Sequence, residues 1–228
     1  MTESSLPNAV LWDWDGTLAD GWPAIGAGLN AAFSAFGMPE WSPEEVKARV
    51  RHSLRDSFPA LFGPDWPRAR DLFYAGVRAR HLDVLRPMPG ARAALDALAA
   101  SGVPTAVVSN KSGPLLRAEA DALGWTPRFR ALVGAGDARA DKPDRAPLRV
   151  ALAACGAPAS PRIWYIGDTA LDVAAARAAG LRAVLVLGGA GDAADGVGAD
   201  EAVADLDALA SDVLRRSKSA LDRGRRMG

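Results

Sequence analysis

The sequence lacks most of the features that mark membrane proteins, secreted scaffolds and nucleic-acid-binding proteins. Its 228 residues include one cysteine, Cys155, so no internal disulfide can form and a reducing compartment is compatible. No run approaches the roughly 18 apolar residues of a membrane span, and residues 1–8 lack the apolar stretch of a signal peptide. Basic and acidic residues both number 27, so no basic field attracts nucleic acid. We therefore expect a cytoplasmic protein whose partners are neither membranes nor nucleic acids.

What the composition does contain is typical of a globular protein with a sizeable core. Apolar residues make up 49% of the chain and charged residues 24%, and the length allows one large domain or two modest ones. Residues 216–228 are predicted to be a basic, solvated and disordered tail. No feature of the sequence indicates an oligomeric state.

Short apolar strands alternate with amphipathic helices over most of the chain. Such alternation predicts a doubly wound, mostly parallel sheet with helices on both faces, an α/β fold of the Rossmann-like type. The strands are expected at residues 10–12, 105–108, 131–133, 163–166, 183–187 and 202–204, and the helices at residues 91–100, 115–123, 146–155, 171–179 and 206–214.

The stretch between about residues 21 and 86 has helical patterns and no strand pattern. One helix is expected from Trp22, another begins at Ser42-Pro43 with acids in its first turn, and a third begins near Asp65. We predict a small all-α insert over residues 20–87, within a catalytic core of residues 1–19 and 88–215. The turn-rich residues 87–90, together with Asp20-Gly21, are the expected hinges.

The first strand leads directly into two aspartates, in the run Asp13-Trp14-Asp15-Gly16-Thr17. In an extended chain Asp13 and Asp15 point to the same side, and Gly16 allows a sharp turn. Two carboxylates at the mouth of an apolar strand repel each other unless a cation lies between them. A strand end with an ordinary turn is the structural alternative.

Polar residues also follow three other predicted strands. Ser109-Asn110-Lys111 follows the second strand, Lys142 comes one loop after the third, and Asp168 and Asp172 follow the fourth. Ligands of parallel α/β sheets bind beyond the carboxyl ends of the strands. The four strand ends are therefore expected to form one site.

These groups suit phosphoryl transfer assisted by a hard cation. Oxygen ligands without cysteine or histidine in reach favour Mg²⁺ over zinc, since the two histidines, His52 and His81, fall in the helical insert. A carboxylate nucleophile would form an aspartyl-phosphate, while Lys142, Ser109 and main-chain amides after Asp13 stabilise the phosphoryl oxygens. Asp15 would protonate the leaving oxygen and then deprotonate water.

The four motifs, in this order and at matching strand ends, resemble those of the haloacid dehalogenase-like superfamily. The resemblance runs from about residue 8 to residue 214 and is greatest to the phosphoglycolate phosphatase-type branch, whose helical cap lies between the first two motifs. It implies an Mg²⁺-dependent phosphatase acting on a small phosphorylated substrate. Trp12 and Trp14 take the place of phenylalanines common around the first motif.

The resemblance also implies a role for each motif residue. Asp13 is implied as nucleophile and metal ligand, Asp15 as acid and base that also binds metal through its main-chain carbonyl, and Asp168 as the remaining metal ligand. Asp172 is implied to lie behind these ligands. The residues implied to surround the phosphate are Asp13, Gly16, Thr17, Ser109, Asn110 and Lys142.

Several alternatives stay open at this point. An acid at position 15 argues against carbon–halogen cleavage, because the dehalogenases of the superfamily lack it. A sugar-phosphate mutase shares the motifs and the cap position, and a non-catalytic regulator would use the same aspartate as a switch. A glycine-rich pattern at residues 189–194 weakly resembles a nucleotide-binding loop, but no apolar helix follows it. Arg49, Arg51 and Arg55 could reach an anionic substrate, although a solvated helix face is the commoner reason for such a run.

Overall fold

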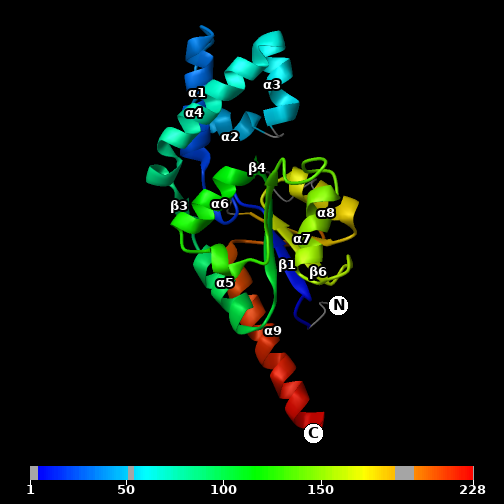
Figure 1. Cartoon of the computed structure of the whole chain (residues 1–228). Helices are drawn as coiled ribbons and strands as arrows, with labels where there is room; N and C mark the ends of the chain where they lie inside the picture. Colours follow the sequence, from blue (N-terminus) through cyan, green and yellow to red (C-terminus); the bar gives the residue numbers. More distant parts are fainter. Residues whose placement is uncertain (1–4, 51–53, 188–197, 228) are drawn as a thin grey trace.

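The core of the protein is one parallel sheet. The computed structural model describes residues 5–50, 54–187 and 198–227. The strands lie in the order β5-β4-β1-β6-β7-β8 and every pairing is parallel, as predicted (Figure 1). Their bounds are β1 Ala9–Trp12, β4 Thr105–Ser112, β5 Leu132–Ala135, β6 Ile163–Gly167, β7 Arg182–Val186 and β8 Glu201–Val203. β1 thus lies between β4 and β6, so three of the predicted motifs lie on or directly after adjacent strands. β4 is longer than the predicted strand of residues 105–108, and Ser109-Asn110-Lys111 therefore falls in its last part and not after it.

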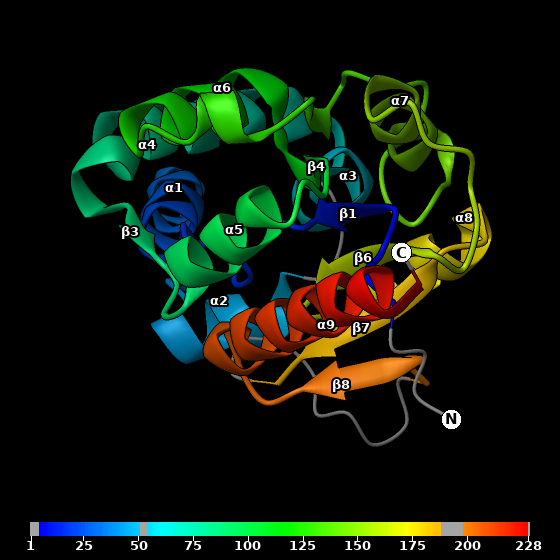
Figure 2. The ribbon, with the colours of Figure 1, turned by 90° about the horizontal axis from the view of Figure 1, so that it is seen from below.

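Helices cover both faces of this sheet (Figure 2). On one face, α5 (Ala91–Ala100), α6 (Gly113–Ala122) and α9 (Leu206–Met227) pack against strand side chains that include Val10 and Trp12. On the other, α7 (Ala146–Ala154) and α8 (Ala170–Ala179) pack against Leu11 and its neighbours. A 3-10 turn, η2 (Thr126–Arg128), precedes β5. Because alternate residues of β1 enter opposite layers, the strand is apolar throughout, and its carboxyl end is held firmly.

The stretch predicted to be all-helical is helical. It contains α1 (Trp22–Ala35), α2 (Pro43–Arg49), α3 (Leu54–Phe62), the 3-10 turn η1 (Gly63–Asp65) and α4 (Trp66–Val84). The expected start of α2 is confirmed, since Ser42 and Glu45 form a reciprocal capping box. Phe33, Phe58 and Phe62 form the centre of an apolar cluster separate from the two clusters of the sheet. We call residues 20–87 the helical insert, and its boundaries as a domain stay a prediction.

Two very short strands join the helical insert to the core. β2 (Ala19–Asp20) pairs antiparallel with β3 (Arg86–Pro87), at the two places where hinges are predicted. The main-chain N–H of Met88 also donates to the carbonyl of Leu18. The chain therefore leaves and re-enters the core side by side.

The structure differs from the prediction of a disordered tail at residues 216–228. The last helix does not end near residue 214 but continues to Met227, and it projects beyond the core in Figure 1. The Arg216 side chain is 6% exposed, forms an ion pair with Asp212, and lies with its guanidinium 5.1 Å from the centre of the Trp164 ring. A basic composition indicated a solvated tail, but arginine stems can cover apolar surface and prolong a helix face.

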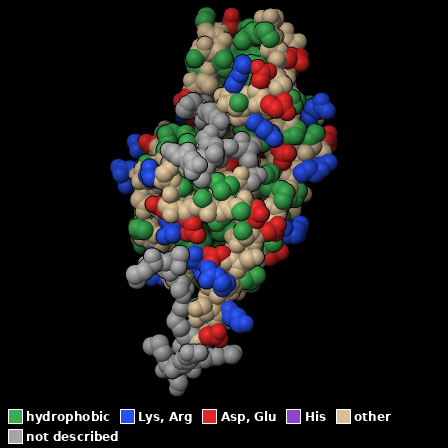
Figure 3. Space-filling model, turned by 180° about the vertical axis from the view of Figure 1, so that it is seen from behind, with side chains coloured by type: hydrophobic (Ala, Val, Ile, Leu, Met, Phe, Trp, Pro, Cys, Tyr) green, Lys and Arg blue, Asp and Glu red, His purple; other side chains and the backbone are tan. Residues whose placement is uncertain are grey.

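Two further observations concern the surface. Basic and acidic side chains are interspersed on the face shown in Figure 3, as the zero net charge suggests. Among the described helices, none combines the length and the apolar character that crossing a membrane requires. The glycine-rich pattern at residues 189–194 lies outside the described residues.

Glycine substitutions in α1 test how closely α1 and α4 approach each other. A Cβ at Gly28 would lie 2.6 Å from Val77 Cγ2 and 2.8 Å from the Phe73 carbonyl oxygen, whereas one at Gly26 would meet nothing nearer than 3.6 Å. Gly28→Ala should therefore lower the free energy of unfolding by about 1–3 kcal/mol. Gly26→Ala, the matched control, should leave it unchanged or raise it by up to about 1 kcal/mol. Urea unfolding monitored by circular dichroism measures both, and equal effects would contradict this packing.

Candidate active site

The loop after β1 brings Asp13 to the carboxyl edge of the sheet. The Asp13 N–H still donates to the Ile166 carbonyl at 2.8 Å, so strand pairing fixes its position. The chain then turns tightly, because the Trp14 carbonyl accepts from the N–H groups of Leu18 and Ala19 at 2.9 and 3.0 Å. Gly16 has φ +88°, and a Cβ there would lie 2.5 Å from Asp168 Oδ2. The glycine is thus required both by its conformation and by the carboxylate beside it.

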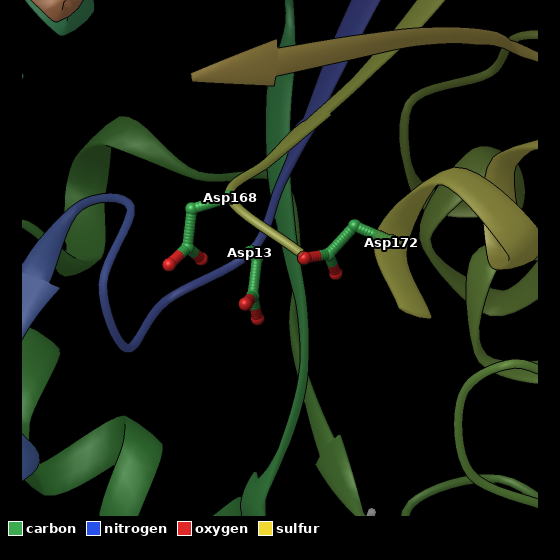
Figure 4. Close-up of side chains that lie close together, drawn as sticks. All are labelled: Asp13, Asp168 and Asp172. Atoms are coloured by element: carbon green, nitrogen blue, oxygen red, sulfur yellow. The ribbon is translucent and has the colours of Figure 1, made fainter. Parts of the chain in front are cut away.

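Three buried carboxyl groups meet at this edge. Asp13 follows β1, Asp168 follows β6, and Asp172 lies in the first turn of α8 (Figure 4). One oxygen from each lies within 4.8 Å of the others. Thr17 Oγ1 donates to Asp168 Oδ1 at 3.1 Å, whereas Asp168 Oδ2 is buried without a partner in the described structure. A buried carboxylate oxygen without a donor is costly unless a cation approaches it.

Lys142 places one positive charge inside this acidic cluster. Its Nζ donates to Asp13 Oδ1 at 2.7 Å and to Asp172 Oδ1 at 2.8 Å. Asn110 holds the lysine from behind: its side-chain oxygen accepts from the Lys142 N–H at 2.9 Å, and its Nδ2 donates to the Lys142 carbonyl at 3.1 Å. The side chain of Asn110, predicted to bind phosphate, therefore positions Lys142 in this structure.

Asp172 is occupied by protein contacts on both oxygens. Oδ1 accepts from Lys142 and, at 3.2 Å, from the Tyr165 hydroxyl, while Oδ2 accepts from Thr169 Oγ1 at 2.7 Å. The main-chain N–H of Thr169 also donates to Oδ2, at 3.1 Å, in the capping box that starts α8. Asp172 therefore anchors the lysine and the helix.

Charge and burial together leave this site short of positive charge. Burial and the nearby Asp172 raise the pKa of Asp13 to about 7, against the effect of Lys142. Burial and the nearby Asp13 raise the pKa of Asp168 to about 8. Burial lowers the pKa of Lys142, but the charges of Asp13 and Asp172 outweigh it, and the pKa lies well above its usual value. A divalent cation beside Asp13 and Asp168 would reverse both acid shifts, and oxygen-only donors fit Mg²⁺.

A second buried network holds Asp15. Lys111 Nζ donates to Asp15 Oδ1 at 2.8 Å and to both oxygens of Glu119, at 2.8 and 2.7 Å. The fully buried Glu119 also accepts from Trp14 Nε1 at 2.7 Å and contacts His81 Nδ1 at 3.0 Å. Burial raises the pKa of Asp15, although Lys111 opposes the shift, so this carboxyl retains a proton more readily than usual.

This network joins the core to the helical insert. His81 belongs to α4, Glu119 to α6, and Lys111 to β4. A Cβ at Gly21, where the helical insert begins, would lie 2.0 Å from Asp15 Oδ1. The predicted acid and base is therefore positioned by groups on both sides of the hinge.

The structure brings the predicted site residues together. Ser109, 5% exposed, lines the same cavity as Asp13, Asp15 and Lys142. Of the three insert arginines, Arg49 lines this cavity, Arg55 forms a 3.4 Å ion pair with Asp141, and Arg51 lies outside the described residues. Sequence reasoning missed Glu119, His81 and Tyr165. A signal exists for Glu119, which is an acid on the apolar face that Leu115 and Leu116 begin.

Comparison with known proteins agrees with this geometry. Residues 10–186 match the haloacid dehalogenase-like hydrolase family. The chain belongs to the haloacid dehalogenase-like hydrolases. A phosphoglycolate phosphatase from Chromobacterium violaceum is 33% identical to this hydrolase over 207 residues, 84% of this chain and 90% of the relative. Another from Caulobacter vibrioides is 34% identical over 185 residues, 78% of each chain.

Solved structures share the fold of this hydrolase. A haloacid dehalogenase-like family hydrolase from Streptococcus pneumoniae superposes with a TM-score of 0.76 over 98% of this chain and 100% of that one, at 20% identity. The predicted family and fold class are confirmed, and the protein is a phosphatase of this family.

Loss of the Glu119 charge should destabilise this hydrolase strongly. Glu119→Gln keeps the shape but leaves the Lys111 ammonium with one carboxylate fewer, so the free energy of unfolding should fall by about 3–5 kcal/mol. Glu45→Gln is the matched control, because Glu45 pairs with Arg49 at the surface and should cost less than about 1 kcal/mol. Denaturant unfolding compares them, and a small effect at Glu119 would mean that the network is dispensable.

Magnesium should stabilise the protein more at pH 8 than at pH 6. Because the pKa values of Asp13 and Asp168 are raised to about 7 and 8, the folded chain keeps protons there that the unfolded chain has lost. Their contribution to stability is therefore present at low pH and is lost as the pH rises through 7–8. Mg²⁺ needs the ionised carboxylates, so the increase in Tm on adding Mg²⁺ should grow over the same range. Differential scanning fluorimetry measures this, and an increase that also persists in Asp168→Asn would place the cation elsewhere.

Proposed function

We propose that this phosphatase is an Mg²⁺-dependent phosphomonoester hydrolase that transfers the phosphoryl group to Asp13. One observation carries the proposal: residues from four separate parts of the chain converge at one edge of the sheet. Asp13, Ser109 and Lys142 line one cavity, and Asp168 lies in the carboxylate cluster with Asp13. A nucleophile, an acid and a phosphate-binding cation are the groups that phosphoryl transfer requires.

In the first step an Asp13 oxygen attacks phosphorus. A bond forms between this oxygen and phosphorus as the bond from phosphorus to the ester oxygen breaks. Asp15 gives its proton to the departing alkoxide, a role that its raised pKa supports. The Lys142 ammonium, 2.7 Å from Asp13, lies where it can bind the phosphoryl oxygens during transfer.

In the second step water removes the phosphoryl group. Asp15, now ionised, accepts a proton from water as the water oxygen bonds to phosphorus. The bond from phosphorus to Asp13 breaks, so inorganic phosphate and the free carboxylate are the products. Lys111, which donates to Asp15 at 2.8 Å, keeps this carboxyl in place for both proton transfers.

Asp13, Asp168 and the main-chain carbonyl of Asp15 would hold the magnesium ion. Mg²⁺ supplies positive charge that offsets the phosphoryl charge and favours the ionised form of Asp13. Support comes from the partnerless Oδ2 of Asp168 and from Gly16, whose missing Cβ leaves this oxygen uncovered. Asp172 is not needed as a ligand, since Lys142, Tyr165 and Thr169 already occupy its oxygens.

The substrate class proposed here is a small phosphorylated metabolite. The relatives described above are named phosphoglycolate phosphatases, which makes phosphoglycolate the reference substrate. The helical insert would contact the part of the substrate that is not phosphate, since it faces the site across the cavity.

Substitution of the two aspartates of the first motif, Asp13 and Asp15, should impair different steps of the reaction. With p-nitrophenyl phosphate and Mg²⁺, Asp13→Asn should reduce turnover on the order of 10⁴-fold or more, because the nucleophile is gone. Asp15→Asn should still release one nitrophenol per chain in a burst, because this leaving group needs little protonation. Its steady-state rate should then be lower by about 10²–10⁴-fold, because no base activates water. Rapid-quench and stopped-flow kinetics distinguish the two.

Three outcomes would replace this proposal. Absence of phosphate release from the wild-type protein would favour a non-catalytic regulator. Release accompanied by isomerisation of a glucose phosphate would favour the mutase alternative. An equal burst from Asp13→Asn would place the nucleophile elsewhere. Circular dichroism spectra matching the wild type would show that both variants are folded.

A further inference from the structure

The catalytic groups open into a cavity of about 510 Å³ between the core and the helical insert. Asp13, Asp15, Ser109 and Lys142 line its core side. This volume lies within the range of sites that enclose whole organic ligands. It exceeds what a phosphoryl group needs, so the cavity has room for the remainder of a substrate.

The insert side of the cavity is apolar. Aromatic and branched side chains from several elements line it, among them Trp41, Phe58, Leu61 and Phe73. Of the described insert residues in this wall, Arg49, Ser57 and Tyr74 are the polar ones, apart from the indoles of two tryptophans. Leu115, at the start of α6, extends the apolar lining onto the core.

The described cations around the cavity already have carboxylate partners. Arg49 pairs with Glu45 at 2.7 Å and lies 5.0 Å from the centre of the Trp41 ring. Lys111 pairs with Asp15 and Glu119. Lys142 pairs with Asp13 and is needed for the phosphoryl group. Among the residues that the structure describes, each cation that lines the cavity is therefore already paired, and a second anionic group would have to displace Glu45 from Arg49.

These two observations determine which leaving group the cavity favours. A carboxylate, such as that of glycolate, would lose its hydration against an apolar wall without gaining an ion pair, which is unfavourable. An aryl or alkyl group would instead bury its own apolar surface there, which is favourable in proportion to its area.

We propose that the substrates of this phosphatase are phosphate monoesters of bulky apolar alcohols, with the aryl or alkyl group held in the helical insert. The inference rests on the proposed function, because the same ester bond is broken and the alcohol leaves with the Asp15 proton. It assigns the substrate a single anionic group, the phosphate. The product alcohol is neutral, so it carries no charge against the apolar cavity wall before it is released.

Binding of n-alkylphosphonates tests the cavity without turnover, because a carbon–phosphorus bond is not cleaved. Calorimetric titration in Mg²⁺ should show the Kd falling about fourfold per added methylene from methyl to hexyl, until the cavity is filled. Phosphonoacetate is similar in size to butylphosphonate but carries a carboxylate in place of the end of the alkyl chain. It should bind at least about tenfold more weakly than butylphosphonate. A Kd independent of chain length, or tighter binding of phosphonoacetate, would overturn the proposal.

A matched pair of lysine substitutions locates the effect. Leu61→Lys places a charge in the cavity wall and should abolish the chain-length dependence, whereas Leu82→Lys alters an exposed leucine of α4 that does not line the cavity. The Leu82→Lys variant should show the same fall in Kd with alkyl chain length as the wild-type protein. Retention of the series by Leu61→Lys, with an unchanged circular dichroism spectrum, would mean that the alkyl group binds elsewhere.

Hydrolysis separates failure of this inference from failure of the proposed function. Hexyl phosphate and phosphoglycolate both release primary alkoxides, so their kcat/KM values compare the two leaving groups directly. We expect hexyl phosphate to be hydrolysed with a kcat/KM at least about tenfold higher. Preference for phosphoglycolate by an active enzyme would overturn the inference alone, whereas no phosphate release from either ester or from p-nitrophenyl phosphate would overturn the proposed function.

Discussion

The Lys142 ammonium lies between two buried carboxylates, those of Asp13 and Asp172, and this contact joins three parts of the chain that are distant in sequence. Each partner is then fixed by something else: Asp13 by strand pairing of β1, Asp172 by the cap of α8, and the lysine main chain by Asn110. A charge in an apolar interior is tolerated only when it is paired and hydrogen-bonded. The fold therefore positions the site, and the site in turn binds the ends of the strands together.

Much of this arrangement follows from local sequence patterns. Asp13 and Asp168 are identifiable because each directly follows an apolar strand, Ser109 because it follows the apolar residues 105–108, and Lys142 because it comes one loop after the next strand. Parallel strands present their carboxyl ends at one edge. The sheet itself follows from the alternation of short apolar runs with amphipathic helices. The helical insert follows from the absence of any strand pattern over some sixty residues.

Other features depend on three-dimensional contacts that no local pattern encodes. Asn110 contacts the main chain of Lys142, and that partner is visible only once the two loops meet. Glu119 and His81 meet across two separate pieces of the chain, so neither residue indicates the other in the sequence. The basic composition of residues 216–228 predicts a disordered tail, whereas the final helix continues there, because the packing of Arg216 against Trp164 is not visible in the composition. The apolar cavity wall is assembled from several insert elements and has no linear signature.

The short β2–β3 ribbon determines which part of the chain can differ in sequence and length without disturbing the parallel sheet. Since the chain departs at Asp20 and returns at Arg86 as a paired neighbour, the helical insert is, topologically, a long excursion from one point of the core. Its length and internal arrangement can vary without moving any strand of the parallel sheet. On the proposal made above, most of the side chains that meet the leaving group lie in this excursion, whereas the groups that break the ester bond lie in the core.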